Sequence, residues 1–197
     1  LIMDAIRSEP RRNKGFDETH REMIATAVRL ISERGPDALS IAELARAMGI
    51  NRTTVYYHFD SREALIEAVK AHATAELTKG MDEHTPVPER TSGITRFVLE
   101  NPELIKLWID DFVSGRDIRD VYPRWDELVE GIGKRFAEQQ PGVEFDAEVY
   151  CALMLAGAII GPRVFANSVR PKASVEAIVS AFWTEEQRVL LRDGLGD

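Results

Sequence analysis

The feature that most constrains the fold is the interval Gly49-Ile50-Asn51, because it separates two short segments of helical pattern by only three residues. In the segment before it, apolar residues recur at helical spacing: Ile41, Leu44, Ala45 and Met48. Gly49 suits the left-handed conformation that ends a helix, and Asn51 is a preferred N-cap for the next one. A turn this short holds two helices at a steep angle, with Ile50 and Val55 at the corner. The sequence therefore predicts a helix-turn-helix.

A third helix is predicted ahead of this pair, from Asp17 to Arg34, because apolar residues recur there at helical spacing and Gly35-Pro36 ends the run. Ser40-Ile41-Ala42-Glu43 has the form of a capping box. In such a box Ser40 accepts from first-turn amides while Glu43 reaches back to the cap. These signals place the motif at about 40–59, inside a three-helix domain of residues 1–61.

Polar and aromatic side chains dominate the helix that follows the turn: Arg52, Thr53, Thr54, Tyr56, Tyr57 and His58. If Val55 and Phe59 face inward, these side chains cannot all be buried, and several stand on an exposed ridge. A helix about 10–12 Å across fits the major groove of DNA. Arginine suits guanine or phosphate, threonine a thymine methyl or base edge, and tyrosine and histidine phosphate oxygens. For Tyr56, ordinary packing is an equally good interpretation.

Charge is divided unevenly along the chain. The net charge is −8, yet residues 1–60 carry 9 Lys+Arg and 9 Asp+Glu, so residues 61–197 hold the whole excess. Between residues 7 and 15 four basic side chains face only Glu9: Arg7, Arg11, Arg12 and Lys14. Because residues 1–60 are neutral overall and begin with a basic arm at 7–15, whereas residues 61–197 are acidic, a polyanion can approach one end of the protein. Such an arm is equally consistent with a solvated terminus.

The stretch "SIAELARAMGINRTTVYYHFDSREAL", preceded by "HREMIATAVRLISERG", closely resembles the DNA-binding domain of the TetR (tetracycline repressor) family. The resemblance covers about the first 65 residues. It implies that Arg52, Thr53 and Thr54 face bases or phosphates and that Tyr56, Tyr57 and His58 are mainly phosphate clamps. It also implies that Ser40 and Arg62, each at a helix start, meet the DNA backbone. Asn51 replaces the family's usual serine or threonine cap but supplies the same acceptor.

The rest of the chain, residues 62–197, is predicted to be helical throughout and to be joined to the first domain by a long helix near 61–79. Further helices are predicted by residues 89–100, 102–115, 121–139, 146–167 and 173–192. The fold expected is therefore all-α, with about nine helices, as the resemblance also implies. The resemblance further implies that this second domain binds a small-molecule effector and forms the dimer.

Two segments are suited to association with another copy. The apolar run 151–161 has only 11 residues, short of a bilayer span, and is predicted to be a buried helix. The residues predicted to lie in a dimer interface are Gly157, Gly161, Val175, Ile178, Val179 and Phe182. An intramolecular core is the alternative. A two-fold dimer would read a near-palindromic operator with half-sites about 34 Å, or a multiple, apart.

Four aromatic residues in the middle of the chain are candidates for an apolar effector pocket: Phe97, Trp108, Phe112 and Trp125. Each is also compatible with plain core. No catalytic residue, cofactor or metal site is predicted: Asp110 and Asp111 diverge on a helix, and the pair His72 and Glu76 lacks further ligands. Phosphate-loop and hydrolase motifs do not occur in the sequence.

The function predicted is a dimeric DNA-binding transcriptional regulator, most readily a repressor that a small ligand releases from its operator. The alternatives are a helical metal- or cofactor-binding enzyme and a helical protein-binding adaptor. A lone cysteine, Cys151 in an apolar run, excludes an intramolecular disulfide and is expected to be a core residue. With no apolar leader in "LIMDAIRSEP", the expected location is the cytoplasm.

Overall fold

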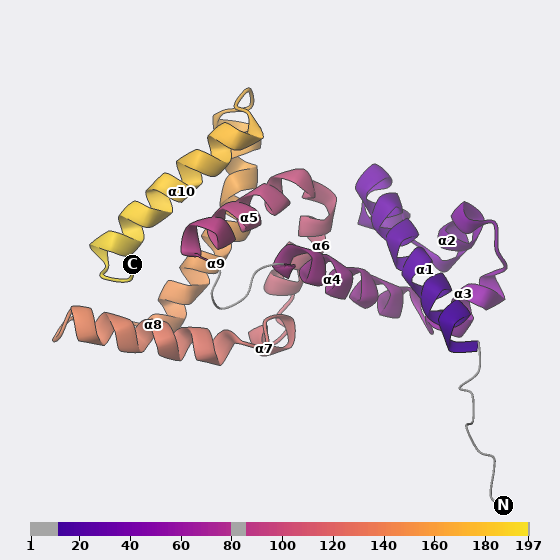
Figure 1. Ribbon diagram of the computed structural model, residues 1–197, viewed down its shortest axis with the longest axis horizontal. Helices are drawn as coiled ribbons and strands as arrows, with labels where there is room; N and C mark the ends of the chain where they lie inside the picture. The colour runs from indigo at the N-terminus through magenta and orange to yellow at the C-terminus, as the bar shows by residue number, and fades with distance from the viewer. Residues whose placement is uncertain (1–11, 80–85, 197) are drawn as a thin grey trace, which may run out of the picture. The chain divides into compact units, whose positions relative to one another are not determined.

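The computed structural model describes residues 12–79 and 86–196, and all regular structure in those ranges is helical (Figure 1). In chain order the elements are α1 (Arg12–Arg34), the 3-10 helix η1 (Pro36–Ala38), α2 (Ile41–Met48), α3 (Arg52–His58), α4 (Arg62–Thr78), α5 (Val87–Glu100), α6 (Pro102–Val113), α7 (Ile118–Val121), α8 (Trp125–Gln139), α9 (Ala147–Val164), the π-helix η2 (Phe165–Val169) and α10 (Val175–Arg192). The predicted all-α fold is confirmed.

These ranges contain ten α-helices where about nine were predicted, and the difference lies at Tyr122-Pro123. The sequence pattern suggested one helix over 121–139. Because a proline disfavours helical geometry in the residue before it, Tyr122 adopts φ −130° and ψ 86° and ends α7. The chain restarts as α8 at Trp125.

The chain divides into two compact units, Leu1–His72 and Ala73–Asp197. The predicted domain boundary after residue 61 coincides with the start of α4, whereas the packing divides inside α4, after His72.

In the first unit, α2 packs against both α1 and α3. Fully buried side chains there come from all four helices and from Leu39 ahead of α2: Met23, Ala27, Ile31, Leu39, Leu44, Val55, Leu65 and Val69. The predicted inward direction of Val55 and Phe59 is confirmed, with 0% and 4% of their surface exposed. This small apolar core fixes the orientation of α3.

In the second unit, α9 is the helix against which α5, α6, α8 and α10 pack, and α5 also packs against α10 (Figure 1). Cys151 faces this core and is buried, as predicted, and its burial raises the pKa of the thiol. The prediction that the whole run 151–161 is buried is wrong. Leu153 is 68% exposed, and Ala156, Gly157 and Ile160 are exposed beside it.

Exposed apolar side chains form a continuous stripe along α9, at intervals of three and four residues: Val149, Leu153, Ala156, Ile160 and Val164. We call this set the α9 stripe. Ala147–Val169 is also long and apolar enough to cross a membrane by length and composition, with a mean hydropathy of 1.7. Such a helix is weak evidence for a membrane span, because helix-packing surfaces have the same composition.

Candidate nucleic-acid interface

The turn between α2 and α3 has the geometry that the sequence predicted. Gly49 adopts φ 66°, and its backbone N–H donates to the carbonyls of Ala45 and Arg46. The side-chain oxygen of Asn51 accepts from the backbone N–H of Thr53 at 3.0 Å. Local hydrogen bonds thus satisfy the end of α2 and the start of α3, which fixes where the turn lies, while the apolar core orients α3.

The outward face of α3 carries the ridge that was predicted for nucleic acid. Arg52, Thr53 and Thr54 are exposed, and Tyr56 and Tyr57 are 52% and 68% exposed. Large aromatic side chains are rarely left this accessible without a partner. Three hydroxyl-bearing or cationic groups in the first turn, followed by two tyrosines, match the donors and acceptors of a DNA groove and its phosphates.

His58 differs from the rest of the ridge because it is half-buried against α1. Its ring stacks on Phe16 with centroids 4.2 Å apart, and the ring of His20 lies 5.6 Å away. The Nδ1 atoms of both histidines are buried and have no hydrogen-bond partner among the described residues. The sequence indicated an exposed phosphate clamp, whereas the structure gives the ring a packing role as well. Phe16 and His20, one turn apart on α1, were the signal for this contact that sequence reasoning missed.

Burial, together with the neighbouring His20, lowers the pKa of His58 below its ordinary value of 6.5. The unfolded chain therefore binds more protons than the folded chain between those two pKa values. We expect the free energy of unfolding of the first unit to fall as the pH falls through about 6.5, with the full loss reached below the folded pKa. In an NMR titration the His58 ring should titrate at lower pH in the folded chain than in urea.

Replacing His58 with Gln should remove this part of the pH dependence of amide exchange in α1 and α3. His72→Gln, at an exposed position on α4, is the matched control. A folded-state titration midpoint equal to or above that of the unfolded chain would contradict the assignment.

Ser40 and Arg62, which the resemblance placed at the DNA backbone, both have structural roles. The Ser40 hydroxyl accepts from the backbone N–H of Glu43 at 3.1 Å, which confirms it as the N-cap of α2. Arg62 donates from Nε to the carbonyl of Leu39 at 2.7 Å and from a terminal nitrogen to that of Pro36 at 3.0 Å. Its guanidinium thus ties α4 to the segment before α2. A contact of either residue with DNA stays a prediction.

The predicted contact from the Glu43 side chain back to the backbone of Ser40 is replaced by ion pairs. The Glu43 carboxylate pairs with Arg46 and, at 3.5 Å, with Arg34. These arginines lie close enough in space to compete with the backbone of Ser40, which the spacing of the box did not reveal. The predicted basic arm falls on residues 7–15. Most of it, including the side chains of Arg12 and Lys14, lies outside the described residues.

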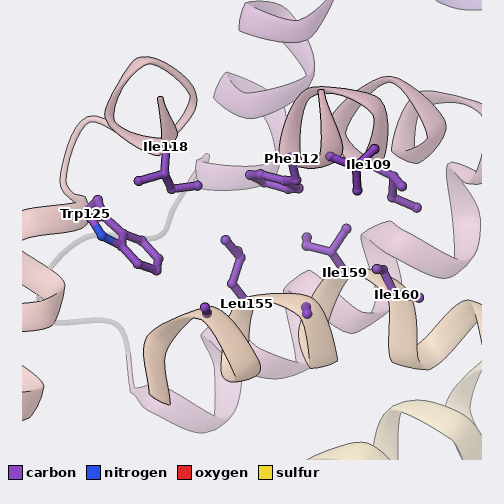
Figure 2. A pocket seen from close by; sticks show the side chains of 10 residues that line it. Ile109, Phe112, Ile118, Trp125, Leu155, Ile159 and Ile160 are labelled. Atoms are coloured by element: carbon purple, nitrogen blue, oxygen red, sulfur yellow. The ribbon is translucent and has the colours of Figure 1, made fainter. Parts of the chain in front are cut away.

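The second unit contains a cavity of about 330 Å³ between α6, the α7–α8 region and α9 (Figure 2). Phe112 and Trp125, two of the four predicted pocket residues, line it together with aliphatic side chains that include Ile118, Leu155 and Ile159. None of the described residues that line it has an ionisable side chain. We call it the apolar cavity. Phe97 and Trp108 do not line it; their rings stack on each other with centroids 5.5 Å apart.

Of the six residues predicted for a dimer interface, five are buried or half-buried and one is exposed. Ile178 and Val179 are 2% and 7% exposed and pack with Leu99 in a core cluster of their own chain, which favours the alternative of an intramolecular core for these two residues. Val175 and Phe182 pack against the same cluster. A Cβ atom at Gly161 would lie 3.1 Å from the Phe182 ring. Gly157 alone is exposed, and a Cβ atom there would meet nothing within 4 Å.

A short helix held by a capped three-residue turn, with an exposed polar and aromatic face, defines a helix-turn-helix DNA-binding protein. Comparison with known proteins gives the same class. Residues 23–69 match the family model "Bacterial regulatory proteins, tetR family". The match identifies residues 23–69 as a DNA-binding domain of the TetR type, and the findings together support a regulator of that family.

Relatives and solved structures extend the likeness beyond the matched segment. The chain is 23% identical over 184 residues to the HTH-type transcriptional repressor Rv3405c of Mycobacterium tuberculosis, covering 92% of this chain and 89% of that protein. Over 46 residues, 23% of this chain and 25% of the relative, it is 35% identical to IcaR of Staphylococcus aureus, a negative transcriptional regulator of the biofilm operon icaADBC. A TetR-family structure from Rhodococcus sp. shares the fold at 18% identity and TM-score 0.59, covering 88% of this chain and 98% of that one.

Proposed function

We propose that this regulator is a homodimeric repressor that binds a near-palindromic operator and leaves it when a small, largely apolar molecule binds its second unit. The observation that carries the proposal is the exposed ridge of α3 on a turn whose caps are satisfied. Relatives that are named as repressors support the direction of regulation.

The contacts with DNA are assigned to α3 and its flanks. Arg52, Thr53 and Thr54 read base edges or adjacent phosphates, and Tyr56 and Tyr57 bind phosphates. His58, which is only half-buried, contributes a further phosphate contact. Selection of bound duplexes from a random pool, at stated salt, tests the proposal directly. It predicts an enriched sequence with two-fold symmetry and half-sites about 34 Å, or a multiple, apart.

The dimer is assigned to the α9 stripe. Its five side chains are apolar, and exposed apolar surface of this continuity marks an interaction site on a soluble protein. The exposed Gly157 lies beside it and permits close approach by a second helix. Pairing the stripe with its symmetry mate buries it, and the same surface meets itself in both subunits as two-fold symmetry requires.

The effector is assigned to the apolar cavity. Its volume of about 330 Å³ lies within the range of ordinary small-molecule sites, and its walls are hydrophobic and aromatic. A ligand shifts a two-state regulator only through its different affinity for the two states. We therefore propose that the conformation with the ligand bound is the one with low affinity for the operator.

The effector prediction uses Trp125 as its reporter. With Trp108 and Trp183 replaced by Phe, Trp125 is the only remaining indole, and it lines the apolar cavity. We expect an effector to quench or shift its fluorescence and to weaken operator binding by about 5- to 150-fold, the usual range of coupling. Phe112→Ala should reduce the fluorescence response while leaving ligand-free operator binding nearly intact.

By thermodynamic reciprocity, bound operator must weaken effector binding by the same factor. A compound that changes Trp125 fluorescence yet leaves operator affinity unchanged is not the effector. If a broad apolar screen yields no compound that alters Trp125, the cavity has no regulatory role.

Two other functions remain distinguishable by simple measurements. Metal analysis of the purified protein separates the regulator from a helical metalloenzyme. For a protein-binding adaptor, the salt dependence decides: binding through phosphates weakens steeply as salt rises, because counterions must be displaced from DNA. The proposal places the regulator in the cytoplasm, where it meets its operator.

A further inference from the structure

A second cavity in the second unit differs from the apolar cavity in containing a carboxyl group. It has a volume of about 230 Å³ and lies between α5, the α7–α8 region, α9 and α10. Trp125 and Leu155 line both cavities and so lie between them. We call this one the Glu186 cavity, because Glu186 of α10 lines it. No lysine or arginine is among the described residues that line it.

The walls of the Glu186 cavity are mostly apolar. The lining residues other than Glu186 are Thr91, Ile94, Thr95, Tyr122, Trp125, Leu128, Cys151, Met154, Leu155 and Ala158. Two aromatic side chains therefore face the same space as one carboxyl group. This combination is suited to an organic cation, which gains from a carboxylate and from the electron-rich faces of aromatic rings.

Glu186 is not neutralised by a neighbouring cation in the described part of the chain. Its side chain hydrogen-bonds Thr91, and no ion pair involves it among the described residues. Arg188, a basic residue of α10 that lines a neighbouring groove with Glu186, pairs instead with Glu185 at 2.7 Å. Burial raises the pKa of the Glu186 carboxyl, against the opposing effect of the Thr91 hydrogen bond. A half-buried carboxyl without a cationic partner is costly to ionise, and a bound ligand cation removes that cost.

The net negative charge of the second part of the chain also favours a cationic ligand. Residues 61–197 contain 24 Asp+Glu and 16 Lys+Arg. The resulting negative field raises the local concentration of small cations and disfavours anionic ligands.

We propose that the Glu186 cavity binds the ammonium end of an amphipathic organic amine, whose apolar part lies against Trp125 and Leu155. The site itself is independent of DNA; only its regulatory consequence rests on the effector-released repressor proposed above. Glu186 accepts the hydrogen bond of the ammonium, and Tyr122 and Trp125 supply the aromatic walls.

The test uses three probes of one shape and different charge: 4-tert-butylbenzylamine, 4-tert-butylbenzyl alcohol and 4-tert-butylbenzoate. Their affinities for the full-length, DNA-free protein are measured by calorimetry at pH 7.5. We expect the amine to bind about tenfold or more tightly than the alcohol, as a charge-assisted hydrogen bond provides, and the benzoate not to bind. Glu186→Gln should abolish the preference for the amine and leave the affinity for the alcohol unchanged.

Glu185→Gln is the matched control: it neutralises the adjacent, exposed carboxylate of α10 and should leave the preference unchanged. Because the bound cation needs an ionised Glu186, affinity for the amine should increase as the pH rises through the pKa of Glu186. The other titratable groups of the lining are Tyr122 and Cys151, and burial raises the pKa of the Cys151 thiol. This pH dependence should be absent in the Glu186→Gln variant.

Equal wild-type affinities for the amine and the alcohol, or preference for the benzoate, would overturn the proposal even if Glu186→Gln failed to fold. So would an amine preference that Glu186→Gln retains. Operator affinity is then measured with and without the amine. Selective binding with unchanged operator affinity confirms the site and contradicts the release mechanism, so the two failures are separate.

Discussion

Replacing Arg52, Thr53 and Tyr57 together by alanine is expected to lower affinity for the selected operator by at least about 100-fold near 0.1 M salt, since each lost base or phosphate contact removes roughly 1–3 kcal/mol. The three side chains are exposed and none belongs to the buried core of the first unit; Tyr57 contacts the half-exposed rings of Phe16 and His58, edge to face. The variant should therefore keep wild-type helicity and thermal stability. Fluorescence anisotropy with labelled operator measures the change.

Single variants separate the roles within the ridge. Tyr57→Ala should weaken binding to all duplexes alike, because a phosphate contact carries no sequence information, whereas Thr53→Ala should change the preferred base. Lys106→Ala is the control for charge. It removes an exposed cation of the second unit that pairs with Glu103 and should leave operator affinity unchanged. Wild-type affinity in the triple variant would refute the assignment of α3 as the reading helix.

The second large effect is expected at Gly157, where leucine should weaken the dimer by about 1–3 kcal/mol or more through overpacking between chains. Within one chain a Cβ atom at Gly157 meets nothing within 4 Å, so the protomer has room for the new side chain. Replacing a helical glycine also raises the stability of α9 itself. Sedimentation should therefore show dissociation with helicity retained, and operator affinity should fall with it.

Gly131→Leu provides the matched control, because Gly131 is likewise exposed on a helix, α8, with nothing within 4 Å of a Cβ atom. It should remain a dimer. Gly161→Leu is a different experiment: its side chain would press on Phe182 in the same chain and destabilise the protomer. If Gly157→Leu sediments as a dimer of wild-type stability, the α9 stripe is not the interface.

The sequence was most informative where structure is determined locally. The left-handed Gly49 and the Asn51 cap depend on contacts within a few residues, and the inward Val55 follows from the helical spacing of apolar residues, so all three were predictable. The misjudged details depend on distant partners. His58 is covered by Phe16 of α1, and the Arg62 guanidinium bonds carbonyls more than twenty residues earlier in the chain.

The second unit was less predictable for a related reason. Apolar residues at helical spacing indicate that a helix buries one face, but not whether the covering surface belongs to the same chain. Ile178 is covered by its own chain, whereas Leu153, equally apolar, is 68% exposed. Glu186 drew no attention in the sequence, since a glutamate on an amphipathic helix is ordinary until the lining of the cavity around it is known.

The bonds of Arg62 have a mechanical consequence. The first residue of α4 is attached to the carbonyls of Pro36 and Leu39, in the segment that leads into α2. Because of these two hydrogen bonds, we expect the start of α4 and the helix-turn-helix to move as one rigid body, with no hinge between them. A rotation of the start of α4 should therefore rotate α2 and α3 with it. If α3 contacts DNA as proposed, we expect these contacts to be lost together, so that release from the operator is a single step.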